Sequence, residues 1–152
     1  MNIFWRIKDY LTRVGKARGF GIQSPWAYTF VTQVISEKWP YYAYEDINRM
    51  PISRREKQLR KLALRVENYV GRARFREFDV HKDSTDDIIA AARQLAPKGA
   101  IILHGIYSSP EAQQLWLQLR DNEVVGITFD LYHCAIMMLD RNIHKQHYHL
   151  NL

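Results

Sequence analysis

The chain has 152 residues, of which 47% are hydrophobic, 25% charged and 12% aromatic. This balance is typical of a globular domain and excludes collagen-like, low-complexity and wholly disordered proteins. The charge is uneven, because residues 1–76 carry 16 Lys and Arg against 6 Asp and Glu, whereas residues 77–152 carry 6 against 10. A chain of 152 residues is long enough for one core, so we expect one domain, 1–152. Its first half is basic and its second half acidic.

The first segment, residues 1–14, has apolar residues at helical spacing, interrupted by charges. It lacks a continuous apolar run and a small-residue cleavage site, so it predicts neither a signal peptide nor a membrane span. It could lie on a membrane surface, although such a stripe more often packs on its own domain. The single cysteine, Cys134, allows no internal disulfide, which favours a cytoplasmic location.

Residues 1–74 predict a helical arm that ends in a basic helix. Ser24 and Pro25 are typical of an N-cap and first helical turn, and they predict a helix to about Lys38. The aromatic stretch 39–50 predicts a short helix or an irregular arm. The clearest helix spans 53–70 and is amphipathic. Its basic stripe, continued just past the helix, consists of Arg54, Lys57, Lys61, Arg65 and Arg72.

The hydrophobic period changes at residue 75, and residues 75–152 predict an α/β core. Helices beginning near Ser84 and at Ser109 separate the first strand-like segments. The strand-like segments are 75–80, 100–106, 124–131, 135–139 and 147–152. The expected fold class is α/β, with a helical N-terminal half packed on a reduced, mostly parallel, Rossmann-like sheet. That sheet would have about four or five strands, including a parallel pair and a C-terminal antiparallel hairpin.

Three segments carry a resemblance to a known family. Residues 19–32 read GFGIQSPWAYTFVT, residues 100–116 read AIILHGIYSSPEAQQLW, and ITFDLY at 127–132 is followed by KQHY at 145–148. These segments resemble the N-terminal arm (G-H-G-x-H-S-P-F), fifth strand and closing hairpin of a bacterial group of class I S-adenosylmethionine (SAM)-dependent methyltransferases. The resemblance implies a sheet reduced to the family's strands four, five, seven and six, in that spatial order.

The same resemblance implies that the cofactor-binding half of the fold is missing. Three β-α units need roughly 90 residues, and the chain passes from the basic helix directly to the segment that resembles strand four. It has no E/D-x-G-x-x-x-G run, so no cofactor-binding residue and no cofactor are expected. The family's two arm histidines are Phe20 and Gln23 in this chain, and a metal-binding pair after strand five is His104 and Gly105.

Asp79, His81 and His104 are the candidate catalytic or metal-binding residues. All three are predicted at the carboxyl ends of neighbouring strands, the edge where open α/β sheets bind ligands. One carboxylate and two imidazoles could hold Zn²⁺, although residual strand-end polarity is the commoner explanation. The histidines at 144, 147 and 149 could bind a surface metal only weakly. Cys134 lies in an apolar run and predicts a buried side chain rather than a nucleophile.

Three functions remain open from the sequence. The first is a methyltransferase-like protein without catalysis that acts in binding or assembly. The second is a SAM-dependent methyltransferase completed by a partner chain or by an unusual ligand site. The third is binding of nucleic acid or another anionic surface through the basic stripe, with Tyr69 or Phe75 stacking on bases. A gene product without a selected role stays a fourth possibility.

The reduced sheet also predicts a partner. Strand 75–80 would lie at a new edge, and its unpaired backbone groups need partners. Either the N-terminal helices cover it, or a second copy or another protein does. We therefore expect a homodimer or a protein partner at this strand.

Overall fold

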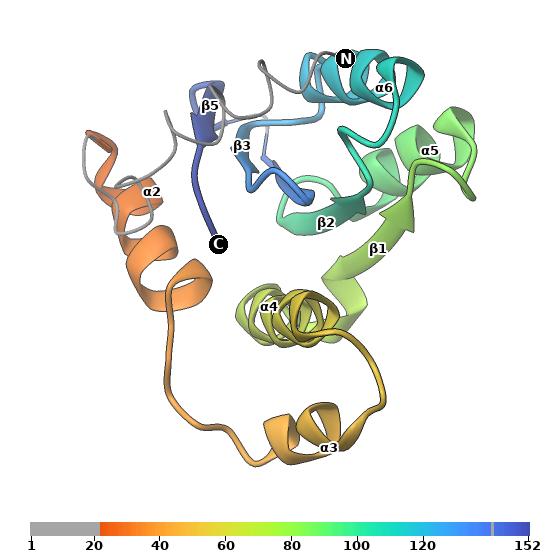
Figure 1. Cartoon of the computed structure of the whole chain (residues 1–152). Coiled ribbons are helices and arrows are strands. Elements are labelled where there is room, and N and C mark those ends of the chain that lie inside the picture. The colour runs from red at the N-terminus through yellow and green to blue at the C-terminus, as the bar shows by residue number, and fades with distance from the viewer. Residues whose placement is uncertain (1–21, 141) are drawn as a thin grey trace.

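A computed structural model of the chain describes residues 22–140 and 142–152 (Figure 1). The predicted segments 1–14 and 15–21 lie outside the described residues. The helical elements are α2 (Pro25–Phe30), the π-helical turn η2 (Val31–Ile35), α3 (Ala43–Arg49), α4 (Arg54–Val70), η3 (Arg72–Arg74), α5 (Thr85–Leu95) and α6 (Pro110–Arg120). The strands are β1 (Phe75–Asp79), β2 (Gly99–His104), β3 (Ile127–Asp130), β4 (Cys134–Leu139) and β5 (Gln146–His149).

The five strands form one mixed sheet in the order β1-β2-β4-β3-β5. β1 pairs with β2 and β3 with β5 in parallel, whereas β4 is antiparallel to both β2 and β3. The α/β class, the parallel pair and the C-terminal hairpin are therefore confirmed. The sheet is not mostly parallel, however, because the residues between β3 and β4 are too few for a crossover and the chain must turn back.

The predicted helix starts are confirmed by their side-chain caps. The hydroxyls of Ser24, Ser84 and Ser109 each accept a hydrogen bond from the backbone N–H three residues later. Ser53 and Glu56 form a reciprocal capping box at the start of α4. These caps explain why helix starts were predictable from sequence.

The helix that begins at Pro25 ends earlier than predicted. It passes into a π-helical turn at Val31 and ends at Ile35 rather than near Lys38. The hydroxyls of Thr29 and Thr32 donate to the carbonyls four residues before them, at 2.9 Å in both cases. Such back-bonding by threonine loosens the backbone ladder and is a physical reason for the change of helix type.

The sheet is covered on both faces, as Figure 1 shows, with α2 and α4 on one side and α5 and α6 on the other. Strand residues alternate between the two layers. In β2, Ala100 and Ile102 pack with α2 and α4, whereas Ile101 and Leu103 pack with α5 and α6. Both faces of β2 and β4 are buried, which explains their continuous apolar sequences.

β1 is an edge strand of this sheet, as predicted. The Val80 N–H donates to the His104 carbonyl of β2 at 3.2 Å. Every second residue of β1 therefore points its N–H and C=O towards β2. The residues between them, Phe75, Glu77 and Asp79, point their N–H and C=O outward, away from the sheet.

Most of these outward groups are capped by nearby side chains and turns. The Phe75 carbonyl accepts from Arg76 Nη1 at 2.7 Å, and the Phe75 N–H bonds within η3. The Asp79 N–H donates to Asp83 Oδ2 at 2.8 Å, and its carbonyl accepts from the following turn. On β1, with partners counted among residues 22–140 and 142–152, Glu77 alone keeps an outward N–H and C=O without a partner. The edge is thus largely satisfied without a second chain, while the homodimer stays a prediction.

None of the described helices is both long and apolar enough to cross a bilayer.

Candidate functional site

Asp79 lies at the carboxyl end of β1, where the sequence places it, but its groups shape the next turn. Its Oδ1 accepts the His81 backbone N–H at 2.8 Å, and its own N–H is held by Asp83. This is the pattern of an Asx-type turn, in which a carboxylate replaces missing backbone partners. The Asp79 carboxylate is therefore engaged in local structure.

The two predicted histidines turn to different partners. His104 Nε2 lies 2.8 Å from Glu77 Oε2 on the neighbouring strand. His81 Nε2 contacts the Ser108 hydroxyl after β2. Across residues 22–140 and 142–152, no three His, Cys, Asp or Glu side chains are grouped so that they could hold a metal ion. The proposed ligand set of Asp79, His81 and His104 is therefore not assembled.

A second polar cluster at the same edge was missed by the sequence analysis. Asp130 ends β3 and is only 2% exposed. Its carboxylate accepts the Tyr107 hydroxyl and, at 2.9 Å, the Tyr132 backbone N–H. His149 Nδ1 at the end of β5 lies 3.3 Å from Asp130 Oδ2. A buried carboxylate that orients a histidine is an arrangement used by general bases, so this pair is the strongest proton-transfer candidate in the described structure.

One sequence signal could have found this cluster. Asp130 follows the apolar segment Ile127 to Phe129, and an acidic residue that closes a buried strand needs partners. The partners themselves come from distant segments, after β2 and in β5, so they needed the strand order. The backbone of Tyr132 has a φ of 72°, which is unusual for a residue other than glycine and sharpens the turn into β4.

The basic stripe does not form one free cationic surface. Arg65 turns inward, where its Nε donates to the Val34 carbonyl at 2.6 Å and its Nη2 to the Ile35 carbonyl at 3.0 Å. Its Nη1 also donates to the Tyr44 hydroxyl at 3.1 Å. The guanidinium therefore caps the carbonyl end of η2. Arg65, an anion-binding candidate from the sequence, is thus engaged within the fold, which a helical wheel could not reveal because it shows direction but not distant carbonyls.

The other members of the stripe differ in how many of their donor groups remain available to bind an anion. Lys57 Nζ donates to the Asn48 carbonyl at 2.7 Å, and Arg72 Nε lies 3.7 Å from Glu67. Lys61 Nζ lies over the Tyr44 ring at 5.2 Å, a cation–π contact that leaves its donors open. Arg54 contacts no acidic group of the described residues. Of the predicted stacking residues, Tyr69 is 49% exposed and Phe75 is buried.

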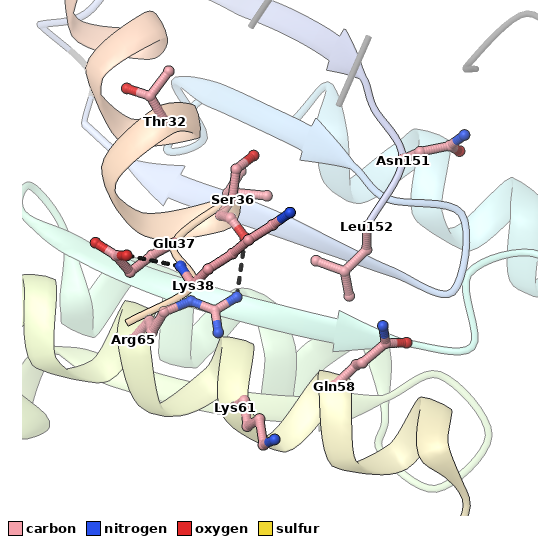
Figure 2. Close-up of a pocket in the computed structure, with 10 residues that line it drawn as sticks. Thr32, Ser36, Glu37, Lys38, Gln58, Lys61, Arg65, Asn151 and Leu152 are labelled. Carbon is pink, nitrogen blue, oxygen red and sulfur yellow. Dashed lines mark hydrogen bonds between the residues drawn. The ribbon is translucent and has the colours of Figure 1, made fainter. Parts of the chain in front are cut away.

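A cavity formed by described residues lies beside α4 (Figure 2). Its volume is about 720 Å³, and a second cavity of about 200 Å³ shares three of its lining residues. We call the two together the α4 groove. Its lining includes Lys38, Arg55, Gln58, Lys61, Asn151 and Leu152. Figure 2 shows Lys38 reaching across from the end of η2 towards the tail at 151–152, with Gln58 and Lys61 on α4 opposite.

Cys134 is fully buried in β4, as predicted. Burial raises the pKa of its thiol far above the ordinary value, and the charges of Asp130 and Glu77 add to this effect. The thiolate is therefore scarce at neutral pH, which removes this residue as a nucleophile.

The aromatic residues Trp26, Trp39, Tyr42 and Tyr44, which could together line a small-molecule pocket, divide in two. Trp26 stacks on Phe30 with ring centroids 5.3 Å apart, and Tyr44 is buried. Trp39 and Tyr42 are instead 71% and 92% exposed. This group therefore does not line a common small-molecule pocket.

No family model, no curated protein and no solved structure matches the chain.

Proposed function

We propose that this chain is a methyltransferase-like protein that acts by binding or assembly rather than by catalysis. The strand order β1-β2-β4-β3 is the order that the resemblance implies for strands four, five, seven and six. β1 is an edge, and the strands that would complete a cofactor cradle beside it have no counterpart in the described sheet. This order supports descent from such an enzyme.

The observation that carries the proposal is the state of the carboxyl edge beside β1. Asp79 holds a turn, His104 pairs with Glu77, and His81 contacts Ser108. Groups that would have to turn towards a substrate instead satisfy one another or the backbone. A reaction at this edge would first have to break these contacts, two of which are made to carboxylates and are stronger than a neutral hydrogen bond.

Calorimetry with SAM and with its demethylated product, S-adenosylhomocysteine, tests the proposal. We expect no saturable heat with either compound up to about 1 mM, because the sequence has no E/D-x-G-x-x-x-G run to cluster backbone amide donors around an adenosyl group. Micromolar binding by the isolated chain would overturn the proposal and favour an enzyme.

A methyltransferase completed by a partner chain is the second candidate, and the Asp130–His149 pair favours it. His149 is half exposed, and its Nδ1 faces the buried carboxylate, so Nε2 is the atom that could accept a substrate proton. If this pair acts, His149→Gln should abolish methyl transfer by the completed complex and leave assembly of the complex unchanged. Full activity of that variant would remove His149 as the base.

A further inference from the structure

The connection between η2 and α3 presents three aromatic side chains to solvent. Trp39 and Tyr42 are 71% and 92% exposed, and Tyr41 is exposed as well. Figure 1 shows this connection at the periphery of the molecule, between α2 and α3. We call Trp39, Tyr41 and Tyr42 the aromatic segment. A single exposed aromatic residue needs no explanation, but three within four residues form a patch of the kind that is typical of interaction sites.

The backbone that carries the aromatic segment is held in place. Glu37 Oε1 accepts the backbone N–H groups of the next two residues at 2.7 and 2.9 Å. The carbonyls of Tyr41 and Tyr42 each accept the N–H of the residue three positions later, at 2.9 and 3.0 Å, and so lead into the first turn of α3. The exposed rings therefore stand on a fixed backbone, which reduces the conformational entropy that binding would cost.

A cation with open donors lies against the same segment. The Tyr41 ring meets the Tyr44 ring edge-on, with centroids 5.2 Å apart. Lys61 Nζ lies over that same Tyr44 ring, 5.2 Å from its centroid. The Lys61 ammonium has no carboxylate partner among residues 22–140 and 142–152. It is therefore placed to bind a phosphate of a chain whose bases stack on the neighbouring rings.

The composition of the aromatic segment indicates the class of ligand. Its exposed apolar surface consists of tyrosine and tryptophan rings alone, and the exposed leucines of the described chain lie on α6 and in the α4 groove. A helix that anchors a protein in a membrane surface usually buries leucine or phenylalanine together with tryptophan. Flat rings beside a cation are instead typical of surfaces for single-stranded nucleic acid, where successive bases stack and the charge follows the backbone.

The charge around the segment favours an anionic ligand. Residues 1–76 carry 16 Lys and Arg against 6 Asp and Glu. Two of the three acids nearest the segment in sequence are engaged, because Glu37 caps the backbone and Glu45 lies 3.6 Å from Arg49. The third, Asp46, lies beyond the segment in the first turn of α3. A polyanion therefore meets more cationic groups than free carboxylates on this side of the molecule.

We propose that the aromatic segment binds single-stranded nucleic acid, with bases stacked on Trp39 and Tyr42 and a phosphate at Lys61. The inference rests on the proposed binding function and names a ligand class for it. These rings take the stacking role that the sequence analysis gave to Tyr69 and Phe75, since Phe75 is buried and Tyr69 packs edge-on against the core. Single strands of RNA and DNA share this chemistry.

Fluorescence anisotropy tests the inference, with the full chain titrated into a labelled oligouridylate about 12 nucleotides long. We expect saturable binding that weakens steeply between about 50 and 200 mM salt. The matching duplex should bind at least about tenfold more weakly, because paired bases cannot stack on the rings. An oligothymidylate of the same length distinguishes RNA from DNA, since only RNA carries the 2′-hydroxyl.

Three results would overturn the inference. The first is no binding of either single strand, and the second is equal binding of the duplex, which would show attraction by charge alone. The third is binding of phosphatidylserine vesicles without binding of the oligonucleotides, which would assign the segment to a membrane surface.

Variants locate the site. Trp39→Ala with Tyr42→Ala should weaken oligouridylate binding about tenfold or more through lost stacking, and Lys61→Gln should make the salt dependence less steep. Tyr28→Ala removes a ring of 49% exposure from α2, and Lys82→Gln removes a charge from the turn after β1. Both controls should bind as the parent does. Unchanged affinity in the double variant, or an equal loss in Tyr28→Ala, would exclude the aromatic segment.

This test and the test of the proposed function fail separately. Oligouridylate contains no adenine, and the aromatic segment lies outside the carboxyl edge of the sheet. Absence of oligouridylate binding would leave the proposed function standing, whereas SAM binding would overturn that function whatever the aromatic segment does.

Discussion

At the scale of single residues, the same side chains that suggest chemistry in the sequence often serve the fold. Arg65 belongs to a basic stripe by its position on a helical wheel, yet its guanidinium binds two carbonyls and a hydroxyl. Asp130 shows in the sequence only as an acidic residue that closes a strand, yet in the fold it joins three segments at the carboxyl edge. Residue type and spacing predicted which groups are polar but not which long-range partners they meet.

Arg65→Ala should destabilise the chain by about 2 kcal/mol, because the carbonyls of Val34 and Ile35 lose their charged donor. Arg54→Ala, which removes the same charge from an exposed position on α4, should change the free energy of unfolding by less than about 0.5 kcal/mol. Urea unfolding of both variants measures the difference. Equal losses would show that Arg65 does not hold η2.

Asp130→Ala should cost about 3 kcal/mol, because the Tyr107 hydroxyl and the Tyr132 N–H lose a buried acceptor. Asp140→Ala is the comparison, since Asp140 also follows a strand but its carboxylate accepts, among the described residues, only the nearby Asn142 N–H. Its effect on the unfolding midpoint should be small. A small effect at Asp130 would mean that the cluster does not stabilise the fold.

At the scale of elements, the sequence predicted the helices and strands well wherever local signals suffice. Serine caps define the starts of α5 and α6, and continuous apolar runs define β2 and β4. The sequence could not reveal how the edge of β1 is satisfied, because the caps on Phe75 and Asp79 depend on side-chain directions. The groove was equally hidden, since its lining comes from η2, α4 and the last residues of the chain.

The cap on β1 predicts a local change in hydrogen exchange. Asp83→Ala removes the acceptor of the Asp79 N–H, so that amide should exchange at least about tenfold faster. Asp86→Ala, in the first turn of α5, is a matched loss of charge and should leave this amide unchanged. Slow exchange at Asp79 in both variants would show that another group protects the edge.

The attachment of β5 should depend on pH through His147. Its Nδ1 lies 2.7 Å from the Thr128 hydroxyl, and burial lowers its pKa, an effect that nearby Arg120 adds to and Asp121 opposes. The unfolded chain, with an ordinary pKa near 6.5, therefore takes up the proton more readily than the folded chain. The stabilising effect of neutral His147 is complete above that pH and declines as the pH falls through the lowered value. Unfolding in urea at about pH 7.5 and 5 should show a smaller decline for His147→Asn than for the parent, and equal declines would contradict this role.

At the scale of the whole molecule, the sheet has two well-packed faces, and β1 is one of its two edge strands. The predicted homodimer would have to form around Glu77, the one residue of the described edge with free outward groups. If it forms there, protection of the Glu77 amide should rise with protein concentration, together with the sedimentation coefficient. A sedimenting dimer whose Glu77 amide still exchanges freely would place the interface elsewhere.

An amide-resolved NMR titration of the whole chain with SAM tests the proposed non-catalytic function most directly. We expect no saturable chemical-shift change at the amides of Asp79, His104 or Asp130, since these residues are already engaged within the fold. Saturable shifts at that edge, with micromolar affinity, would mean that the isolated chain binds the methyl donor, and would contradict the proposed non-catalytic function.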